Sequence, residues 1–350
     1  MSMFYTVQYG DTLPSIANHF GITPLSLAQL NDIPYPYSVY EGDTLFIEFN
    51  MVPLSINNDE TNYSQAGIGY VNAWERANGE QNCLDTETIE DIIGKKGTLQ
   101  ADVLKFTFPR YDLKVNIGTI TLEPEFALTS WMALHQVNND CTVMGDIVLL
   151  EDEVSPVMSQ AIANGFEITA LHNHLLYEIP RIMFMHISGL GNAQQLAQGI
   201  KNMLSETGTP ITAKSSSSTL SPDYWSSVET IMGAKGKQVG NVIQFSFPRA
   251  DTIKEFNMTI PPSMGISQAI NFQSEGEYAA VTGDFVLISE EVEHVVRTLK
   301  QYGISITAIH NHMLYEEPRL FYLHFWAVDN PEMLAYALRQ TLEQTNYLAG

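Results

Sequence analysis

One segment of the chain occurs twice with little change, and it constrains the fold more than any other feature of the sequence. The first copy occupies residues 168–186 and the second occupies residues 306–324. In each copy, an apolar run rich in strand-forming residues leads into a Tyr-Glu-x-Pro-Arg turn, and a second apolar run follows. This pattern predicts a β-hairpin. Six of the nine histidines of the chain lie in these two hairpins.

The histidines of each hairpin are spaced so that they share one face. His172 and His174 are two residues apart on the incoming strand. Their side chains therefore point to the same side, roughly 6.6 Å apart along the strand. If the hairpin is centred near Ile179, His186 lies directly opposite His172. The second hairpin repeats the arrangement with His310, His312 and His324.

Imidazoles and a carboxylate on one face suit Zn²⁺, Mn²⁺ or Fe²⁺, and three protein ligands with an open position are typical of catalytic metals. We therefore expect one metal site in each hairpin. The candidate ligands are His172, His174, Glu178 and His186 in the first copy, and His310, His312, Glu316 and His324 in the second.

Two other interpretations of the histidines stay open. In the first, the imidazoles have a structural role and form hydrogen bonds to Asp146, Asp284 or backbone carbonyl groups. In the second, they help to form a pocket for an anionic ligand, because arginine can bind a carboxylate or phosphate through two donors. The candidate anion-binding residues are Arg110, Arg181, Arg249 and Arg319.

The duplication extends well beyond the hairpins. Residues 106–110 (Phe-Thr-Phe-Pro-Arg) return as residues 245–249, and the Gly-Asp pair at 145–146 returns at 283–284. Each copy predicts strands around these motifs, followed by a helix, the hairpin and a last helix. This order predicts an α+β fold with a mainly antiparallel sheet that helices cover on one face. The predicted helices after the Gly-Asp strands and after the hairpins span residues 154–164, 193–205, 292–302 and 331–345.

Four motifs recur in both copies: Pro-Arg-x-Asp, Gly-Asp-x-Val-Leu, Thr-Ala-x-His-Asn-His and Glu-x-Pro-Arg. Together they resemble the domain of unknown function typified by the LppY and LpqO lipoproteins. The resemblance covers roughly residues 70–207 and 222–347, and it implies no particular activity. The chain departs from the lipoprotein pattern, because no lipobox cysteine lies near its first residue.

The first fifty residues carry a different pattern. A strand over residues 4–8, two short helices and a closing strand within residues 40–48 give a βααβ order. With Val-Gln-Tyr-Gly-Asp-Thr-Leu at residues 7–13, this order resembles a LysM domain. The resemblance implies binding of an N-acetylglucosamine glycan, such as peptidoglycan or chitin, in a shallow groove. The groove residues that it implies are Gly10, Asp11, Thr12, Leu13, Asn31, Asp32 and Ile33.

Local roles are also open for two of these groove residues, since Asp11 can cap a helix and Leu13 can belong to the core. The expected organisation is a LysM module at residues 1–49, a linker at 50–69, a first repeat at 70–207, a Ser-rich linker at 208–221 and a second repeat at 222–350. We expect the two repeats to pack as a pseudo-twofold pair, because duplicated surfaces can form an isologous contact. Further oligomerisation stays open.

Charge and composition restrict the partners. The chain has 40 acidic and 17 basic residues, a formal net charge of −23. This charge repels nucleic acids and anionic membranes, so neither is an expected partner. No apolar run reaches the roughly 18 residues of a membrane span, and the first ten residues lack the pattern of a signal peptide.

Two functions fit these features. The first is a protein of the cell envelope or a spore layer that binds cell-wall glycan and whose repeats bind a ligand or metal. The second is a metal-dependent enzyme that acts on carbohydrate or a cell-wall component. A cytoplasmic location is the alternative to the envelope.

Overall fold

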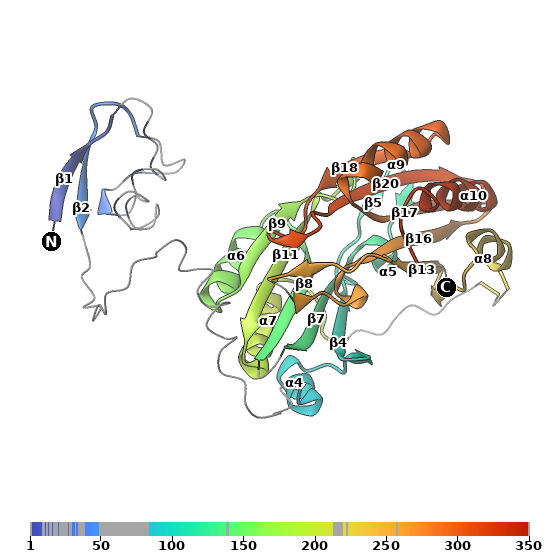
Figure 1. Cartoon of the computed structure of the whole chain (residues 1–350), viewed down its shortest axis with the longest axis horizontal. Coiled ribbons are helices and arrows are strands. Elements are labelled where there is room, and N and C mark those ends of the chain that lie inside the picture. Colours follow the sequence, from blue (N-terminus) through green and yellow to red (C-terminus); the bar gives the residue numbers. More distant parts are fainter. Residues whose placement is uncertain are drawn as a thin grey trace. The chain divides into compact units, whose positions relative to one another are not determined.

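A computed structural model describes residues 2–8, 11, 13, 16, 20, 27, 30, 31, 33, 39–48, 84–137, 140–212, 220–221, 223–256 and 258–348. The chain divides into two compact units, Met1–Ser64 and Gln65–Gly350 (Figure 1). The second unit has an α+β fold built from two repeated halves with antiparallel sheets, which confirms the predicted fold class. Among the described residues, no helix is both long enough and apolar enough to cross a membrane.

The first unit is held together by one strand pair and a small core. Strands β1 (Ser2–Thr6) and β2 (Thr44–Glu48) pair in antiparallel fashion. Both predicted strands are present, although β2 starts four residues later than predicted. The second of the two predicted short helices, at residues 24–30, lies mostly outside the described residues. The buried core consists of Val7, Leu13, Ile16, Leu27, Leu45 and Ile47.

The first repeat of the second unit is built on a six-stranded sheet with the order β3-β4-β7-β8-β11-β9. Its strands are β3 (Thr98–Gln100), β4 (Val103–Pro109), β7 (Thr129–Val137), β8 (Asp140–Leu150), β9 (Glu167–His172) and β11 (Ile182–Gly191). A small sheet joins β10 (Glu178–Ile179), β5 (Asn116–Ile117) and β6 (Ile120–Thr121). The helices are α4 (Thr86–Ile93), α5 (Pro124–Ala127), α6 (Val154–Ala163) and α7 (Ala193–Ser205).

The second repeat has the same topology, with the sheet order β12-β13-β16-β17-β20-β18. Its strands are β12 (Lys237–Val239), β13 (Val242–Pro248), β16 (Ser267–Glu275), β17 (Tyr278–Leu287), β18 (Ser305–His310) and β20 (Phe321–Asp329). The small sheet joins β14 (Lys254–Glu255), β15 (Met258–Thr259) and β19 (Glu316–Glu317). The helices are α8 (Ser226–Met232), the 3₁₀ helix η2 (Pro262–Met264), α9 (Ser289–Gln301) and α10 (Pro331–Leu342).

Helices cover one face of each six-stranded sheet, as the sequence predicts. In the first repeat, Ile89 of α4, Val157 of α6 and Ile200 of α7 pack on the sheet in one buried cluster. A separate cluster joins α8, α9 and α10 to the second sheet. Each repeat therefore has its own helix-covered core, and the other face of each sheet is left for a different contact.

The faces without helices meet each other. Two further buried clusters each contain residues of both repeats. In one of them, Val103 and Met144 of the first sheet pack with Ile253, Met264 and Val286 of the second repeat. In the other cluster, the second repeat contributes residues of its sheet, and the first repeat contributes residues that lie mainly outside its sheet. Figure 1 shows α5 of the first repeat beside β13 and β16 of the second. The two sheets are thus buried between two outer layers of helices.

Hydrogen bonds across this contact occur in equivalent pairs. Lys105 Nζ donates to the backbone oxygen of Ser263 at 2.9 Å. At the matching position of the second repeat, Gln244 Nε2 donates to the backbone oxygen of Glu125 at 2.6 Å. Buried clusters and hydrogen bonds related in this way confirm the predicted pseudo-twofold packing of the repeats.

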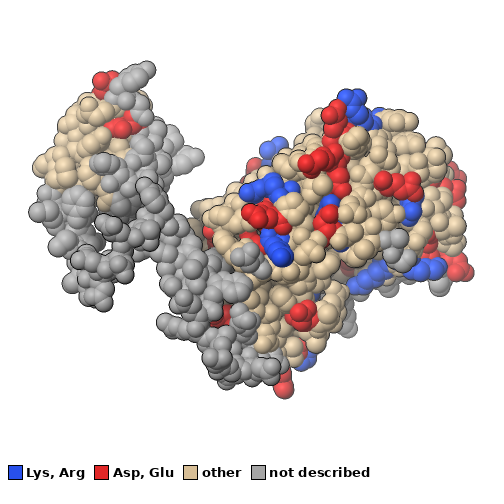
Figure 2. Space-filling view, in the orientation of Figure 1, with Lys and Arg blue, Asp and Glu red and all other residues tan. Residues whose placement is uncertain are grey.

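On the visible surface, Lys and Arg side chains lie in small groups beside Asp and Glu (Figure 2).

A carboxyl group at the junction of the repeats makes stability sensitive to pH. Burial, and the nearby carboxylates of Glu316 and Glu167, raise the pKa of Glu255 from 4.5 to about 7. The folded state therefore holds this proton more tightly than the unfolded chain does. The contribution of Glu255 to the free energy of unfolding should be fully present below about pH 4.5 and should be lost as the pH rises through 7. Above that pH, the folded protein must keep the poorly solvated charge of this carboxylate.

Replacing this group with an uncharged one should remove the effect. We expect Glu255→Gln to increase the free energy of unfolding by about 1–3 kcal/mol at pH 8, because the buried charge is gone, and to change it little at pH 4. Urea unfolding at both pH values measures the difference. The exposed Glu277→Gln is the control and should have no pH-dependent effect. An equal shift at both pH values would show that the charge of Glu255 is not responsible.

Candidate functional site

Both predicted hairpins form, but their register differs from the prediction. His172 pairs with Phe184, and His186 pairs with Ala170. The second hairpin has the same register, with His310 opposite Tyr322 and His324 opposite Ala308. The prediction that His186 lies directly opposite His172 is wrong. The observed pairs His172–Phe184 and Ala170–His186 place the centre of the hairpin at Glu178, one residue before Ile179. His172 and His186 are instead diagonal neighbours.

The histidines of the two hairpins form one cluster instead of two separate sites. His172 and His310 stack with ring centroids 3.5 Å apart. Two further cross-repeat pairs are His174 with His324 at 3.8 Å, and His186 with His312 at 3.6 Å. We call these six residues the six-histidine cluster. Each close pair takes one ring from each repeat, so the pseudo-twofold contact assembles the cluster.

Aromatic rings from the returning strands hold two of the imidazoles in place. His174 stacks on Phe184 at 3.4 Å between ring centroids. The equivalent pair, His312 and Tyr322, stacks at 3.6 Å. His174 and His312 both follow the last residue of their strand, so this stacking fixes side chains that no strand pairing holds. The sequence carried a signal for it, because an aromatic residue stands two positions before His186 and before His324.

Most ring nitrogens of the cluster are buried without a hydrogen-bond partner among the described residues. They are both nitrogens of His172 and His310, and the Nε2 atoms of His174, His186, His312 and His324. A buried polar atom with no partner costs about 1–3 kcal/mol. A ligand or ordered water must therefore satisfy these nitrogens if the cluster is to be stable. Their concentration at one point favours a single shared ligand.

Burial keeps five of these imidazoles neutral. Desolvation and the neighbouring rings lower the pKa of His172 and of His310 from 6.5 to about 3. The same causes hold the pKa of His174, His186 and His312 well below the ordinary value. A neutral imidazole has a free lone pair, and it is the form that coordinates a metal. These five imidazoles are therefore in the metal-binding form at neutral pH.

Two sets of ligand atoms are close enough to hold an ion. Within each set, the atoms lie within 4.8 Å of one another. One set joins His172, His174, His310, His312 and His324, and the other joins Asp146, His174 and His186. Nitrogen donors with a carboxylate match the preferences of Zn²⁺ and Fe²⁺, and a carboxylate also suits Mn²⁺. Imidazoles from both repeats contribute to the first set.

Two aspartates at equivalent positions flank the cluster. A carboxylate oxygen of Asp284 contacts Nδ1 of His324. Asp146 lies with an oxygen 3.7 Å from Nε2 of His186, and that oxygen has no hydrogen bond among the described residues. Burial, and the charge of Asp284, raise the pKa of Asp146 well above its ordinary value. The sequence suggested both aspartates only as hydrogen-bond partners, whereas the structure places Asp146 among the possible ligands.

The structure does not bring the two predicted glutamate ligands into either set of ligand atoms. Glu316 accepts a hydrogen bond from the backbone of Leu320 at 2.9 Å, and it lies 3.4 Å from the Arg319 guanidinium. Glu178 is buried at the equivalent hairpin tip, where desolvation raises the pKa of its carboxyl group. Arg319 also donates to the backbone oxygen of Leu314, and Arg181 is exposed. These four side chains shape the hairpin tips.

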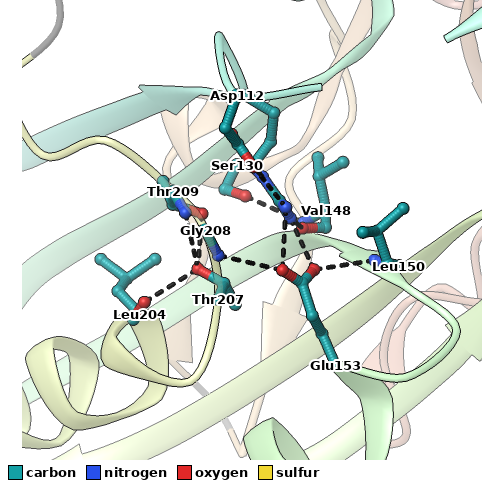
Figure 3. A network of polar contacts seen from close by, with 10 residues as sticks. Asp112, Ser130, Val148, Leu150, Glu153, Leu204, Thr207, Gly208 and Thr209 are labelled. Atoms are coloured by element: carbon teal, nitrogen blue, oxygen red, sulfur yellow. Dashed lines mark hydrogen bonds and ion pairs between the residues drawn. The ribbon is translucent and has the colours of Figure 1, made fainter. Parts of the chain in front are cut away.

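The other two predicted arginines lie in buried ion-pair networks. Arg110 is fully buried, and its Nη1 donates to the backbone oxygen of Val148 at 2.6 Å and to Glu153 at 2.8 Å. Asp112 accepts from Nη2 at 2.8 Å. Figure 3 shows Glu153 at the centre of this network, where it also accepts from Leu150 and Gly208.

The second repeat contains the equivalent network. Arg249 donates to the backbone oxygen of Val286 at 2.6 Å and pairs with Asp251 and Glu291. In both networks, acids within the fold neutralise the guanidinium group. A cavity lies beside the six-histidine cluster, and neither Arg110 nor Arg249 lines it. This arrangement favours a structural role for both arginines over the binding of an external anion.

A cavity of about 460 Å³ opens beside the six-histidine cluster. Its walls come from the sheets of both repeats. Its lining includes Asp146, His174, His186, Asp284, His312 and His324. A small molecule in this cavity would therefore contact residues that are able to hold a metal.

The predicted glycan groove is described only in part. Asp11 accepts hydrogen bonds from Tyr5 and from the backbone of Gln8, at 2.7 and 2.8 Å. Leu13 belongs to the buried core, and Asn31 bonds to the backbone of Phe46 in both directions. Ile33 is half-buried. Gly10, Thr12 and Asp32 lie outside the described residues, so a glycan-binding role for this set stays a prediction.

Comparisons with known proteins agree with the two kinds of domain. One family model, described as a Domain of Unknown Function (DUF1259), matches residues 87–206 and 226–344. A second, the LysM domain, matches residues 5–48. No curated protein matches the chain.

Among solved structures, the microcompartment shell protein PduB, a trimeric bacterial protein, is similar at 10% identity over 72% of this chain and 95% of its own, with a TM-score of 0.19. EtuB from Clostridium kluyveri is similar at 9% identity over 71% of this chain and 90% of its own, with a TM-score of 0.17. At such low TM-scores, neither likeness bears on fold or function.

Proposed function

The chain belongs to the family described as a Domain of Unknown Function (DUF1259), in two copies that follow a LysM domain, and from this premise we propose that it binds cell-wall glycan and holds a divalent metal between its repeats. The proposed organisation is the LysM module at residues 1–49, linkers at 50–69 and 208–221, and repeats at 70–207 and 222–350. The likeness of the repeats to the LppY and LpqO lipoproteins is part of this proposal.

One observation carries the metal proposal: the six-histidine cluster buries many ring nitrogens that have no partner among the described residues. A purely structural role would require a hydrogen bond for each of them, since unpaired buried polar atoms are costly. A metal ion satisfies several lone pairs at once, and the depressed pKa values of His172 and His310 leave the lone pairs of these two rings free. The proposed ions are Zn²⁺, Mn²⁺ or Fe²⁺.

Metal analysis tests this proposal directly. After treatment with a chelator and dialysis, the full chain should take up Zn²⁺, Mn²⁺ or Fe²⁺ to a fixed stoichiometry, measured by elemental analysis and calorimetric titration. His294→Ala, on the exposed side of α9, is the matched control and should bind like the wild type. If the chain takes up none of the three ions in a saturable way, the proposal is wrong and the cluster has a structural role.

The LysM module supplies the second part of the proposed function. LysM domains imply binding to peptidoglycan or chitin, and this supports association with the cell wall, at the envelope or in a spore layer. We expect insoluble chitin or cell wall to retain the full chain and not a truncated chain that starts at Gly69. A single shallow groove gives modest affinity, so retention should be partial at low ligand concentration. The His174→Ala full chain is the control and should be retained, whereas equal retention of the truncated chain would contradict this role.

A metal-dependent enzyme is the second candidate function, and one observation favours it. The cavity of about 460 Å³ leads to the histidines and aspartates that are able to hold a metal, so a bound molecule would lie beside the ion. A metal with an open position can polarise a carbonyl group or activate water. Incubation of metal-loaded protein with cell-wall fragments, followed by mass spectrometry, distinguishes the two functions, because only an enzyme changes the mass of the fragments.

A further inference from the structure

The cavity beside the six-histidine cluster is formed jointly by the two repeats. Strands β4 and β7 of the first sheet and β13 and β16 of the second supply its walls, and four histidines of the cluster also line it. Its volume of about 460 Å³ lies within the range of small-molecule sites, which span about 300–1,000 Å³. Neither repeat contains the whole cavity by itself.

Hydroxyl side chains line this cavity in equivalent pairs. Thr107 of β4 and Ser246 of β13 occupy matching positions and are exposed to it, and their hydroxyl groups have no hydrogen bond to any described residue. A second pair is Thr129 and Ser267, whose hydroxyls donate to the backbone oxygens of Pro124 and Pro262. The lone pairs of this second pair face no other donor among the described residues. The walls thus offer both donors and acceptors to a ligand.

Amide side chains add to this polar lining. Asn271 donates through Nδ2 to the backbone oxygen of Phe126 at 2.9 Å, which leaves its side-chain oxygen as an acceptor. Gln100 is exposed at the cavity, and its side-chain amide has no hydrogen bond to a described residue. Directed hydroxyl and amide groups on a site of this size fix the orientation of a ligand that itself carries many hydrogen-bonding groups.

The charges around the cavity disfavour a strongly anionic ligand. Its lining contains two basic residues, Lys105 and Lys237, against three acidic ones, Glu125, Asp146 and Asp284. Lys105 already donates to the backbone of Ser263 and lies 4.3 Å from the centre of the Trp131 ring. Burial also lowers the pKa of Lys105 to about 8, so this side chain is still mostly charged at neutral pH. Apart from the metal itself, the lining therefore offers no excess of positive charge to a phosphate or polycarboxylate.

We infer that this cavity binds an uncharged, hydroxyl-rich ligand of the saccharide class, which lies with one end beside the metal at the six-histidine cluster. The inference rests on the proposed function, because the metal forms one wall of the site. It adds a second saccharide-binding site to the chain, separate from the LysM module. Such a ligand would form hydrogen bonds to the paired hydroxyls of both repeats.

A paramagnetic metal reports whether a sugar lies in the cavity. The full chain is loaded with Co²⁺, which takes imidazole ligands as Zn²⁺ does, and Zn²⁺ provides the diamagnetic reference. Proton relaxation of a soluble N-acetylglucosamine trimer is then measured by NMR with each metal. We expect Co²⁺ to increase the relaxation rate of the sugar protons at least fivefold over Zn²⁺. N-acetylglucosamine 1-phosphate is the charged probe and should show a weaker effect.

Cavity variants separate this site from the LysM module. Thr107→Trp and Ser246→Trp place a large ring in the cavity and should reduce the Co²⁺ effect at least fivefold without changing metal content. Thr107→Val keeps the shape and removes the hydroxyl, so a smaller reduction is expected even if the larger change disturbs folding. Ser159→Trp, exposed on α6, is the matched control and should behave like the wild type.

The possible outcomes distinguish saccharide binding in the cavity from the proposed metal binding on which it rests. Failure of the chain to load Co²⁺ or Zn²⁺ overturns the proposed metal site and this inference together. Bound Co²⁺ with no effect on the sugar, or with an effect that persists in both tryptophan variants, overturns this inference alone. A stronger effect on the phosphorylated sugar overturns the assignment of an uncharged ligand.

Discussion

Saturation with Zn²⁺ should raise the free energy of unfolding by about 3–4 kcal/mol when the free ion is roughly 100–1,000 times its dissociation constant. The expected gain follows from the buried ring nitrogens of the six-histidine cluster, which have no partner in the described part of the chain and which the metal would satisfy only in the folded state. Chemical unfolding in the presence and absence of the ion measures this difference. A chelator should reverse it.

Substitutions in either repeat should abolish the whole gain. His174 and His312 come from different hairpins, yet their ligand atoms belong to one set. We therefore expect His174→Ala and His312→Ala each to remove the metal-dependent stabilisation, whereas two separate sites would lose only half of it in each variant. His294→Ala should keep the full gain. If the cluster is structural, His174→Ala instead destabilises the metal-free protein by about 1–3 kcal/mol and added metal has no effect on the wild type.

Removal of the buried guanidinium of the first repeat should have an effect of similar size. We expect Arg110→Ala to lower the free energy of unfolding by about 3–5 kcal/mol, because Glu153 and Asp112 would remain near one another without a cation. The carbonyl of Val148 would also lose its donor. Urea unfolding of the metal-free protein measures the loss.

A surface ion pair offers the matched control for this prediction. Arg297 pairs with Glu293 on α9, and both side chains are largely exposed, at 74% and 71%. Arg297→Ala should therefore leave the stability nearly unchanged, since solvent screens such pairs. Arg249→Ala, in the equivalent buried network, should behave like Arg110→Ala. A small effect at both buried positions would show that water enters these networks and solvates the acids.

Local patterns in the sequence predicted the elements of the fold well. The predicted helix at residues 193–205 coincides with α7, because Asn192 caps its first turn through Gln194 and Gln195. The equivalent α10 starts as predicted and ends three residues early, at Leu342. Caps and apolar spacing act over a few residues, so they can be read from the sequence. The two hairpins were predictable for the same reason.

The assembly of the site was not predictable from these patterns. Alternation along a strand tells which side chains share a face, but it does not tell which surface covers that face. His172 and His310 were placed on equivalent faces, and their contact at 3.5 Å depends on how the two sheets meet. The register differed from the prediction because the centre of the first hairpin is Glu178 and not Ile179. The contact between the two sheets arises from segments far apart in the sequence.

The internal pseudo-twofold axis has a consequence for how this protein is able to vary. In a symmetric homodimer, every substitution appears on both sides of the axis, so paired positions stay identical. Here one chain supplies both sides, and paired positions already differ: Lys105 faces Ser263 where Gln244 faces Glu125, and His174 stacks on Phe184 where His312 stacks on Tyr322. Each half of the shared centre is therefore encoded separately, and one half can change its chemistry while the other preserves the assembly.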